Sequence, residues 1–139
     1  MRARALILLV PLVTTLSACG SNNTPTTPTA PTQTFTDSFS GILTPQARIA
    51  HLFTTQAGGN VDITLVSVSP LNTLAIGVGG GTWDGSVCTV PLGGLRNDDM
   101  REGSVLTGSV TSAGTYCVLV YDSGNVQDDV NYTVQVLHP

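Results

Sequence analysis

A cluster of oxygen-bearing side chains lies in the stretch 96–103 and is the first candidate for chemistry. Its members bring amide and carboxylate oxygens close together, and such hard donors are the ligands that calcium prefers. The candidate ligands are Asn97, Asp98, Asp99 and Glu102, which Asp122 or the pair Asp128 and Asp129 would join if the fold brings those loops near. The spacing lacks the alternating donors of an EF-hand loop, so calcium binding is expected to be weak. The alternative is a solvated acidic loop.

The only tryptophan of the chain lies in a second candidate site. Trp83 precedes Asp84 in the predicted glycine-rich loop 82–85. The aromatic ring is able to stack on a sugar ring, with Asp84 as a polar group beside it, so this loop is a candidate glycan-binding site. The alternative is that Trp83 covers one end of the hydrophobic core.

The two histidines do not predict an active site. His51 lies between apolar residues on a predicted strand, and His138 is the penultimate residue. This spacing matches neither a metal site nor a catalytic triad. The run 77–81 is rich in glycine but lacks the lysine and helix of a phosphate-binding loop. We therefore expect His51 to be a structural residue and the protein to be neither an enzyme nor a cofactor carrier.

The first 18 residues have the pattern of an export signal. Arg2 and Arg4 precede the apolar stretch 6–13, which is too short to span a bilayer comfortably. If residues 1–18 are removed, three arginines remain against nine acidic residues, a formal charge of −6. This acidic surface argues against nucleic acid as a partner and against peripheral binding to anionic lipid.

The signal ends in the sequence Leu-Ser-Ala-Cys at 16–19, which resembles the bacterial lipobox. The resemblance implies that Cys19 becomes the acylated first residue, carrying diacylglyceryl and an N-linked chain such as palmitate. Three acyl chains exceed what stable membrane anchoring requires. Gly20 follows where aspartate would favour the inner membrane of enterobacteria, so by analogy we expect the outer membrane of the bacterial envelope. The alternative is an ordinary signal peptide with a chance cysteine.

A tether is predicted to follow the lipidated cysteine. Residues 19–34 contain no charge and no large apolar side chain after Cys19, and proline recurs at every third position from Pro25 to Pro31. Such a segment cannot bury enough surface to fold by itself. Extended like polyproline, it would hold the domain up to ~45 Å from the bilayer. The alternative interpretation of this segment is a glycosylation site at its threonines.

Cys88 and Cys117 remain as an even pair in an exported chain, which favours a disulfide. It would close a loop of about thirty residues and contribute roughly 3 to 4 kcal/mol. Two buried free thiols are the first alternative. A nucleophilic cysteine is the second, and it would need one of the two histidines within reach as a base.

Residues 35–139 are predicted to form one all-β domain, because turn signals recur every eight to fifteen residues. Alternation in the stretch 114–121 places apolar side chains on both faces, as in a central strand covered on both sides. Eight strands, the number of a jelly roll, are expected at 39–43, 49–55, 61–68, 74–78, 87–92, 104–110, 116–121 and 131–137. The predicted architecture is a single eight-stranded, jelly-roll-like β-sandwich after a signal peptide and a flexible linker.

Three segments, 56–65, 113–120 and 131–136, resemble the bacterial pre-peptidase C-terminal domain. They match its Ala-Gly turn before an apolar strand, its Gly-Thr-Tyr strand and its final Tyr-Thr strand. The resemblance implies a β-sandwich that acts as an accessory module. Calcium binding, reported for some relatives, is not implied here, because the stretch 74–100 lacks the family's Asp-rich strand. These motifs concern the fold far more than the ligand.

We therefore expect a non-catalytic, membrane-anchored lipoprotein whose sandwich contacts an envelope protein or another envelope component. Its partner is unknown from the sequence. The alternatives are a glycan-binding module that uses Trp83 and a weak calcium-binding module.

Overall fold

The computed structural model describes residues 33–91 and 94–139, and it contains nine β-strands. The strands are β1 (Phe35–Leu43), β2 (Arg48–Thr55), β3 (Gly59–Ser69), β4 (Ile76–Trp83), β5 (Cys88–Thr89), β6 (Arg96–Met100), β7 (Val105–Val110), β8 (Gly114–Tyr121) and β9 (Val130–His138). In these two ranges there is no helix that could cross a membrane. The predicted signal peptide, Cys19 and nearly all of the predicted tether lie outside the described residues.

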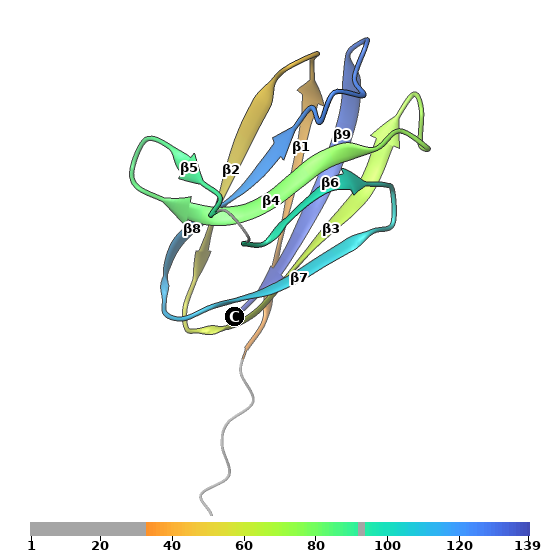
Figure 1. Cartoon of the computed structure of the whole chain (residues 1–139). Helices are drawn as coiled ribbons and strands as arrows, with labels where there is room; N and C mark the ends of the chain where they lie inside the picture. Colours follow the sequence, from red (N-terminus) through yellow and green to blue (C-terminus); the bar gives the residue numbers. More distant parts are fainter. Residues whose placement is uncertain (1–32, 92–93) are drawn as a thin grey trace, which may run out of the picture. The chain divides into compact units, whose positions relative to one another are not determined.

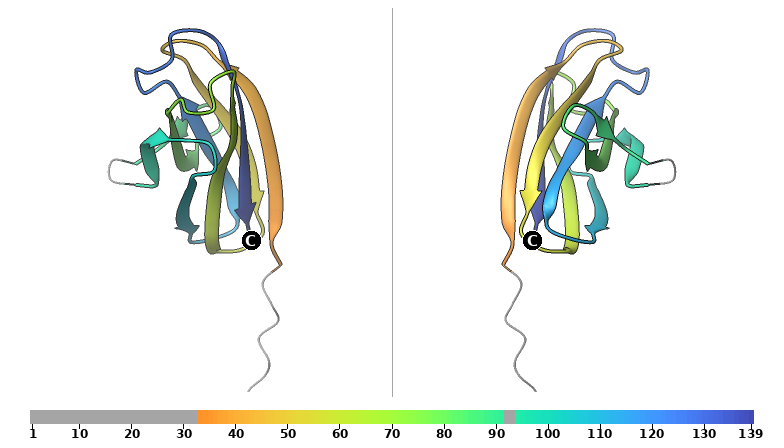
Figure 2. Two further views of the ribbon diagram at one scale, coloured as in Figure 1. Left: turned by 90° about the vertical axis from the view of Figure 1, so that its right-hand side faces the viewer. Right: turned by 90° about the vertical axis from the view of Figure 1, so that its left-hand side faces the viewer.

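The strands form two antiparallel sheets that pack face to face, as Figure 2 shows. One sheet has the order β1-β9-β3-β7, and the other has the order β2-β8-β4-β5 with β6 also paired to β4. The pairs β1–β9, β2–β8, β3–β7 and β4–β6 nest like one long hairpin that has been rolled up. This nesting is the jelly-roll arrangement, and the two-residue β5 is an addition to it. The all-β sandwich predicted from the sequence is confirmed.

The core lies between the two sheets. In β3, the side chains of Val61, Ile63 and Leu65 are buried. From the opposite sheet, Val118 and Val120 of β8 are fully buried in the same cluster. Burial of these side chains between two sheets is the main favourable contribution to folding.

β8 is the central strand of its sheet, with β2 on one side and β4 on the other. Its inner face packs on the core, and its outer face carries Cys117, Leu119 and Tyr121. Cys117 and Tyr121 are only 0% and 5% exposed although they point away from the core. The prediction that both faces of this strand are covered is therefore confirmed.

The stretch 74–92 differs from the prediction. β4 continues through the three glycines at 79–81 and ends at Trp83, where the sequence suggested a turn and a loop. Glycine is required here because other groups lie against the strand on both faces. Val90 packs over Gly79, the Thr89 carbonyl lies over Gly81, and Leu95 lies against Gly80 on the inner side. The predicted strand at 87–92 is reduced to β5, and residue 92 lies outside the described residues.

The stretch 96–103 also differs, because most of it is strand β6 rather than a loop. The two steps along β4 from Ile76 to Val78 are matched by three steps along β6 from Met100 to Asn97, so β6 contains a bulge. The Asn97 side chain accepts a hydrogen bond from the Asp99 amide within this bulge, at 2.9 Å. The irregularity turns Met100 into the core while its neighbours stay exposed. Four of the five residues of β6 are polar or charged, so the sequence did not indicate a strand here. Such residues protect a sheet edge from pairing with other chains.

The sandwich has two distinct ends. Phe35 at the start of β1 pairs with His138 near the end of β9, so both ends of the folded domain lie together, at the lower end in Figure 1. Three loops lie at the other end, which is the upper end in Figure 1. They are 44–47 between β1 and β2, 70–75 between β3 and β4, and 122–129 between β8 and β9. We call these three loops the loop end.

Candidate functional site

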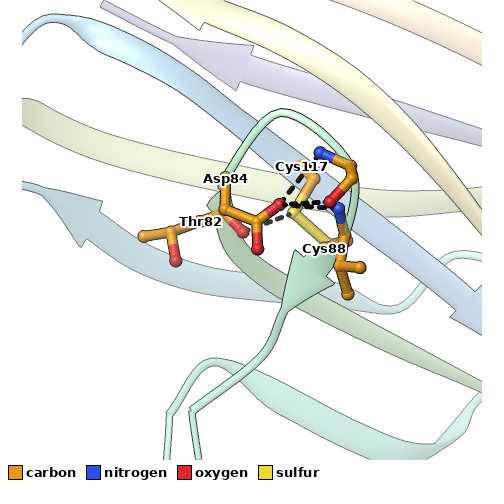
Figure 3. The surroundings of a disulfide bond; sticks show 6 residues. Thr82, Asp84, Cys88 and Cys117 are labelled. Carbon is orange, nitrogen blue, oxygen red and sulfur yellow. Dashed lines mark hydrogen bonds between the residues drawn. A yellow bond between two sulfur atoms is a disulfide. The ribbon is translucent and has the colours of Figure 1, made fainter.

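The β4–β5 hairpin carries three of the residues singled out from the sequence, Trp83, Asp84 and Cys88, and Figure 3 shows how Asp84 and Cys88 lie. Cys88 and Cys117 form a disulfide, with the sulfur atoms 2.09 Å apart and the Cα atoms 5.8 Å apart. The bond ties β5 to β8, although both strands pair with β4 rather than with each other. The hairpin is therefore folded back over the outer face of β4, where Gly79 and Gly81 leave room for it.

Asp84 organises the tip of this hairpin. Its Oδ1 atom accepts hydrogen bonds from the backbone amides of Ser86 and Val87, at 2.9 and 2.8 Å, and from the Ser86 hydroxyl, at 3.1 Å. These donors lower the pKa of the Asp84 carboxyl group. Trp83 is half-buried next to it and pairs with Cys88 across the hairpin. The Asp84 carboxylate, which a sugar ligand would contact, is therefore already hydrogen-bonded within the turn.

The four candidate calcium ligands are not brought to one point. Asp98 binds Arg96, with Nη2 to Oδ1 at 2.8 Å, and the same oxygen accepts a hydrogen bond from the Tyr121 hydroxyl. Asp99 pairs with Arg101 at 3.3 Å. Glu102 accepts a hydrogen bond from the Val68 amide, also at 3.3 Å. Across 33–91 and 94–139, no three acidic, histidine or cysteine side chains gather as a metal site would require.

Asp122, proposed as a further calcium ligand, is the organising residue of the loop end. Its Oδ2 atom accepts a hydrogen bond from the Gln46 amide, at 2.9 Å. Its Oδ1 atom accepts from the amides of Gly124, Asn125 and Val126, at 2.7, 2.9 and 3.0 Å. Burial opposes ionisation, but the four amides outweigh it and lower the pKa of this carboxyl group. The carboxylate therefore joins the loops 44–47 and 122–129.

The third loop is tied to the same assembly by side chains. The Asn125 amide donates to the Ala75 carbonyl at 3.2 Å, and Arg101 donates to the Thr73 carbonyl at 2.7 Å. A hollow of about 340 Å³ lies between Leu71 and the acidic residues Asp128 and Asp129. Leu71 is 60% exposed, which is the largest exposure among the exposed hydrophobic residues of the described chain. Fixed loops around an open apolar residue with an acidic rim make the loop end a candidate contact surface.

Both histidines are structural residues, as expected for His51. The Nε2 atom of His51 lies 2.7 Å from the Tyr132 hydroxyl, which links the two sheets, and its ring stacks on Phe39 with centroids 4.9 Å apart. Burial lowers the pKa of His51 and raises that of Tyr132 to about 12. His138 is buried and its Nε2 atom lies 3.1 Å from an oxygen of Asp37.

Sequence reasoning missed the contacts of Tyr121 with the arginines. Arg48 and Arg96 approach the Tyr121 ring from β2 and β6, with their Cζ atoms 5.8 and 5.2 Å from its centroid. Burial and the hydrogen bond to Asp98 raise the pKa of Tyr121 to about 12. The only signal in the sequence was that an acidic domain retains three arginines. That two of them, Arg48 and Arg96, meet at Tyr121 depends on the rolled strand order.

No protein-family model matches the chain, and no curated protein matches it either.

Proposed function

We propose that this protein is a non-catalytic lipoprotein of the bacterial envelope that presents a β-sandwich on a membrane-anchored tether. The lipobox-like sequence ending at Cys19 supports the anchor, and the Pro- and Thr-rich segment 19–34 supports the tether. The jelly-roll sandwich is consistent with the resemblance to the pre-peptidase C-terminal domain, which remains part of this proposal. The outer membrane is the proposed location.

One observation supports an interaction role more than any other. The folded domain begins at Phe35, whereas the loop end lies at the opposite end of the sandwich. A tether that leads to Phe35 would leave the loop end as the part most accessible to a partner. The loops are fixed by the hydrogen bonds that Asp122 accepts and that Asn125 donates, so little conformational entropy is lost when they bind.

The proposed partner is an envelope protein that offers a basic and partly apolar surface. Leu71 provides the apolar contact, and the carboxylates of Asp128 and Asp129 provide the negative charge. Complementary charge would steer the encounter, while the apolar contact would slow dissociation.

The anchor is tested by membrane fractionation. The wild-type protein should remain with the membrane until detergent is added, whereas Cys19→Ser should leave the membrane or accumulate as an uncleaved precursor. Release of the wild-type mature protein without detergent would contradict the anchor.

The contact surface is tested by photo-crosslinking in intact cells. A photoreactive amino acid at position 71 of the loop end is compared with one at the exposed position 112, in the turn between β7 and β8 at the other end. A discrete adduct from position 71 that is absent at position 112, and that is lost in Asp128→Asn/Asp129→Asn, supports the proposal. Equal adducts at both positions, or none at position 71, contradict it.

A further inference from the structure

A groove on the outer face of the second sheet has the features of a binding site that is separate from the loop end. It encloses about 260 Å³ and is formed by strands β2, β8 and β6 together with the disulfide-bonded β5 segment. Arg48, Arg96 and Tyr121 form its polar part, and Leu119 and Val90 form its apolar part. Residues from four different elements thus meet here.

The charge of the groove is opposite to that of the domain. Two of the three arginines of residues 35–139 line it, in a domain with nine acidic residues. Arg96 is neutralised by Asp98, with Nη2 to Oδ1 at 2.8 Å. Arg48 is exposed, and its guanidinium takes part in none of the side-chain hydrogen bonds or ion pairs found within 33–91 and 94–139. The groove therefore retains one uncompensated positive charge.

The groove is held in shape before any ligand arrives. The Tyr121 ring lies on Gly77, and its hydroxyl donates a hydrogen bond to Asp98. Asp98 also accepts a hydrogen bond from Arg96 and so holds that side chain in place. The disulfide fixes the opposite wall, and Val90 is seated against Gly79. Binding to a preformed site loses less free energy to ordering than binding to a flexible one.

We propose that this groove binds a small organic carboxylate. The planar guanidinium of Arg48 presents parallel N–H donors that match the two oxygens of a carboxylate. Leu119 and Val90 line the same groove and would cover an apolar group attached to that carboxylate. One net positive charge suits a monoanion better than phosphate, because Asp98 would repel a second negative charge.

The test uses the full chain in a nonionic detergent and saturation-transfer NMR with small ligands. N-acetylleucine carries a carboxylate next to an apolar side chain, glucuronate carries one on a sugar, and N-acetylleucinamide lacks the charge. A dissociation constant of about 1 mM is expected for the better of the two carboxylates, as its small size allows. N-acetylleucinamide and inorganic phosphate should bind at least tenfold more weakly. Whichever of N-acetylleucine and glucuronate binds more tightly then tells whether the natural carboxylate belongs to a peptide end or to an acidic sugar.

Arg101 provides the matched control, because it lies outside the groove and is paired with Asp99. Arg48→Gln should weaken carboxylate binding at least tenfold, and Arg48→Lys should weaken it less, since lysine keeps the charge but not the two parallel donors. Arg101→Gln makes the same change in net charge and should leave binding unaffected. The proposal is overturned if neither carboxylate binds saturably, if the uncharged amide binds equally well, or if Arg48→Gln and Arg101→Gln behave alike. None of these results depends on the anchor or on the crosslink at position 71.

Discussion

The ring of Tyr121 lies directly on Gly77 of the neighbouring strand. The two residues are paired across β4 and β8, and a Cβ atom on residue 77 would overlap the ring atoms Cε2, Cζ and Cδ2. Because residue 77 has no side chain, the ring lies over the strand and its hydroxyl reaches Asp98 on β6. The glycine thus determines the position of the tyrosine and, through it, of Asp98 and Arg96.

Gly77→Ala should destabilise the domain by about 1 to 3 kcal/mol, the usual cost of inserting a group into a packed site. Chemical denaturation gives the free energy of unfolding. Gly114→Ala is the control, because its added Cβ would meet only Tyr116 at an ordinary 3.7 Å. Equal effects of the two substitutions would show that the contact with Tyr121 is not the cause.

Removal of the disulfide is expected to destabilise the protein more strongly. The bond joins cysteines 29 positions apart. The double variant Cys88→Ala/Cys117→Ala should lower the free energy of unfolding by about 3 to 4 kcal/mol, because the unfolded chain gains the freedom of that loop. Denaturation of the oxidised protein and of the double variant measures the difference. A mass that shows two free thiols in the exported wild-type protein would contradict the bond itself.

The sequence predicted the features that depend on local alternation. Apolar side chains on both faces of the stretch 114–121 predicted a strand that is covered on both sides, because strands expose successive side chains to opposite faces. The cysteine pair was predicted from its even number in an exported chain. Neither inference required knowledge of which strands are neighbours.

The features that depend on strand neighbours were not predictable. The run 79–81 suggests a turn by its composition, yet it lies in β4, where Thr89, Val90 and Leu95 pack against its bare backbone. β6 has the composition of a loop and becomes a strand because the exposed edge of β4 offers it hydrogen-bond partners. The meeting of Arg48 and Arg96 at Tyr121 likewise follows from the rolled strand order.

Acid should weaken the domain through His51. Burial lowers the pKa of His51 below its ordinary value of 6.5, so the unfolded chain binds more protons than the folded one between these two values. The stabilising contribution is complete above about pH 6.5 and is lost as the pH falls through the lowered pKa. Urea denaturation between pH 5 and 8 should show this slope in the wild type.

His51→Gln should flatten that slope, because glutamine can still bond the Tyr132 hydroxyl but does not titrate. His138→Gln is the comparison, since His138 is the other histidine of the domain. The carboxyl groups of Asp84, Asp98 and Asp122 have lowered pKa values, so their protonation changes the free energy of unfolding only at a more acidic pH. An unchanged slope in His51→Gln would assign the effect to another group.

Calcium should not stabilise the domain. Arg96, Arg101 and the Val68 amide already hold the carboxylates of Asp98, Asp99 and Glu102 in separate places. A site with a dissociation constant of 0.1 mM would add about 2.7 kcal/mol in 10 mM calcium, which thermal unfolding would reveal easily. We expect no change in Tm on adding calcium or a chelator. A calcium-dependent rise that disappears in Asp98→Ala/Asp99→Ala would restore the calcium hypothesis.

Trp83 should contribute to stability rather than to sugar binding. Its side chain is half-buried at the end of β4, opposite the disulfide-bonded Cys88. Trp83→Ala should cost about 2 kcal/mol, less than the 3 to 5 kcal/mol of a fully buried aromatic residue. Trp83→Phe keeps an aromatic ring and should cost less. Chemical denaturation of the three proteins tests this order.

The competing glycan hypothesis makes an opposite prediction for the same residue. It requires that the fluorescence of Trp83 respond saturably to envelope polysaccharide and that Trp83→Ala abolish binding while the domain stays folded. Because Asp84 is held by the Ser86 and Val87 amides, we expect no saturable response in the wild type. A saturable response would instead mean that the β4–β5 hairpin, fixed by its disulfide, presents Trp83 to a ligand.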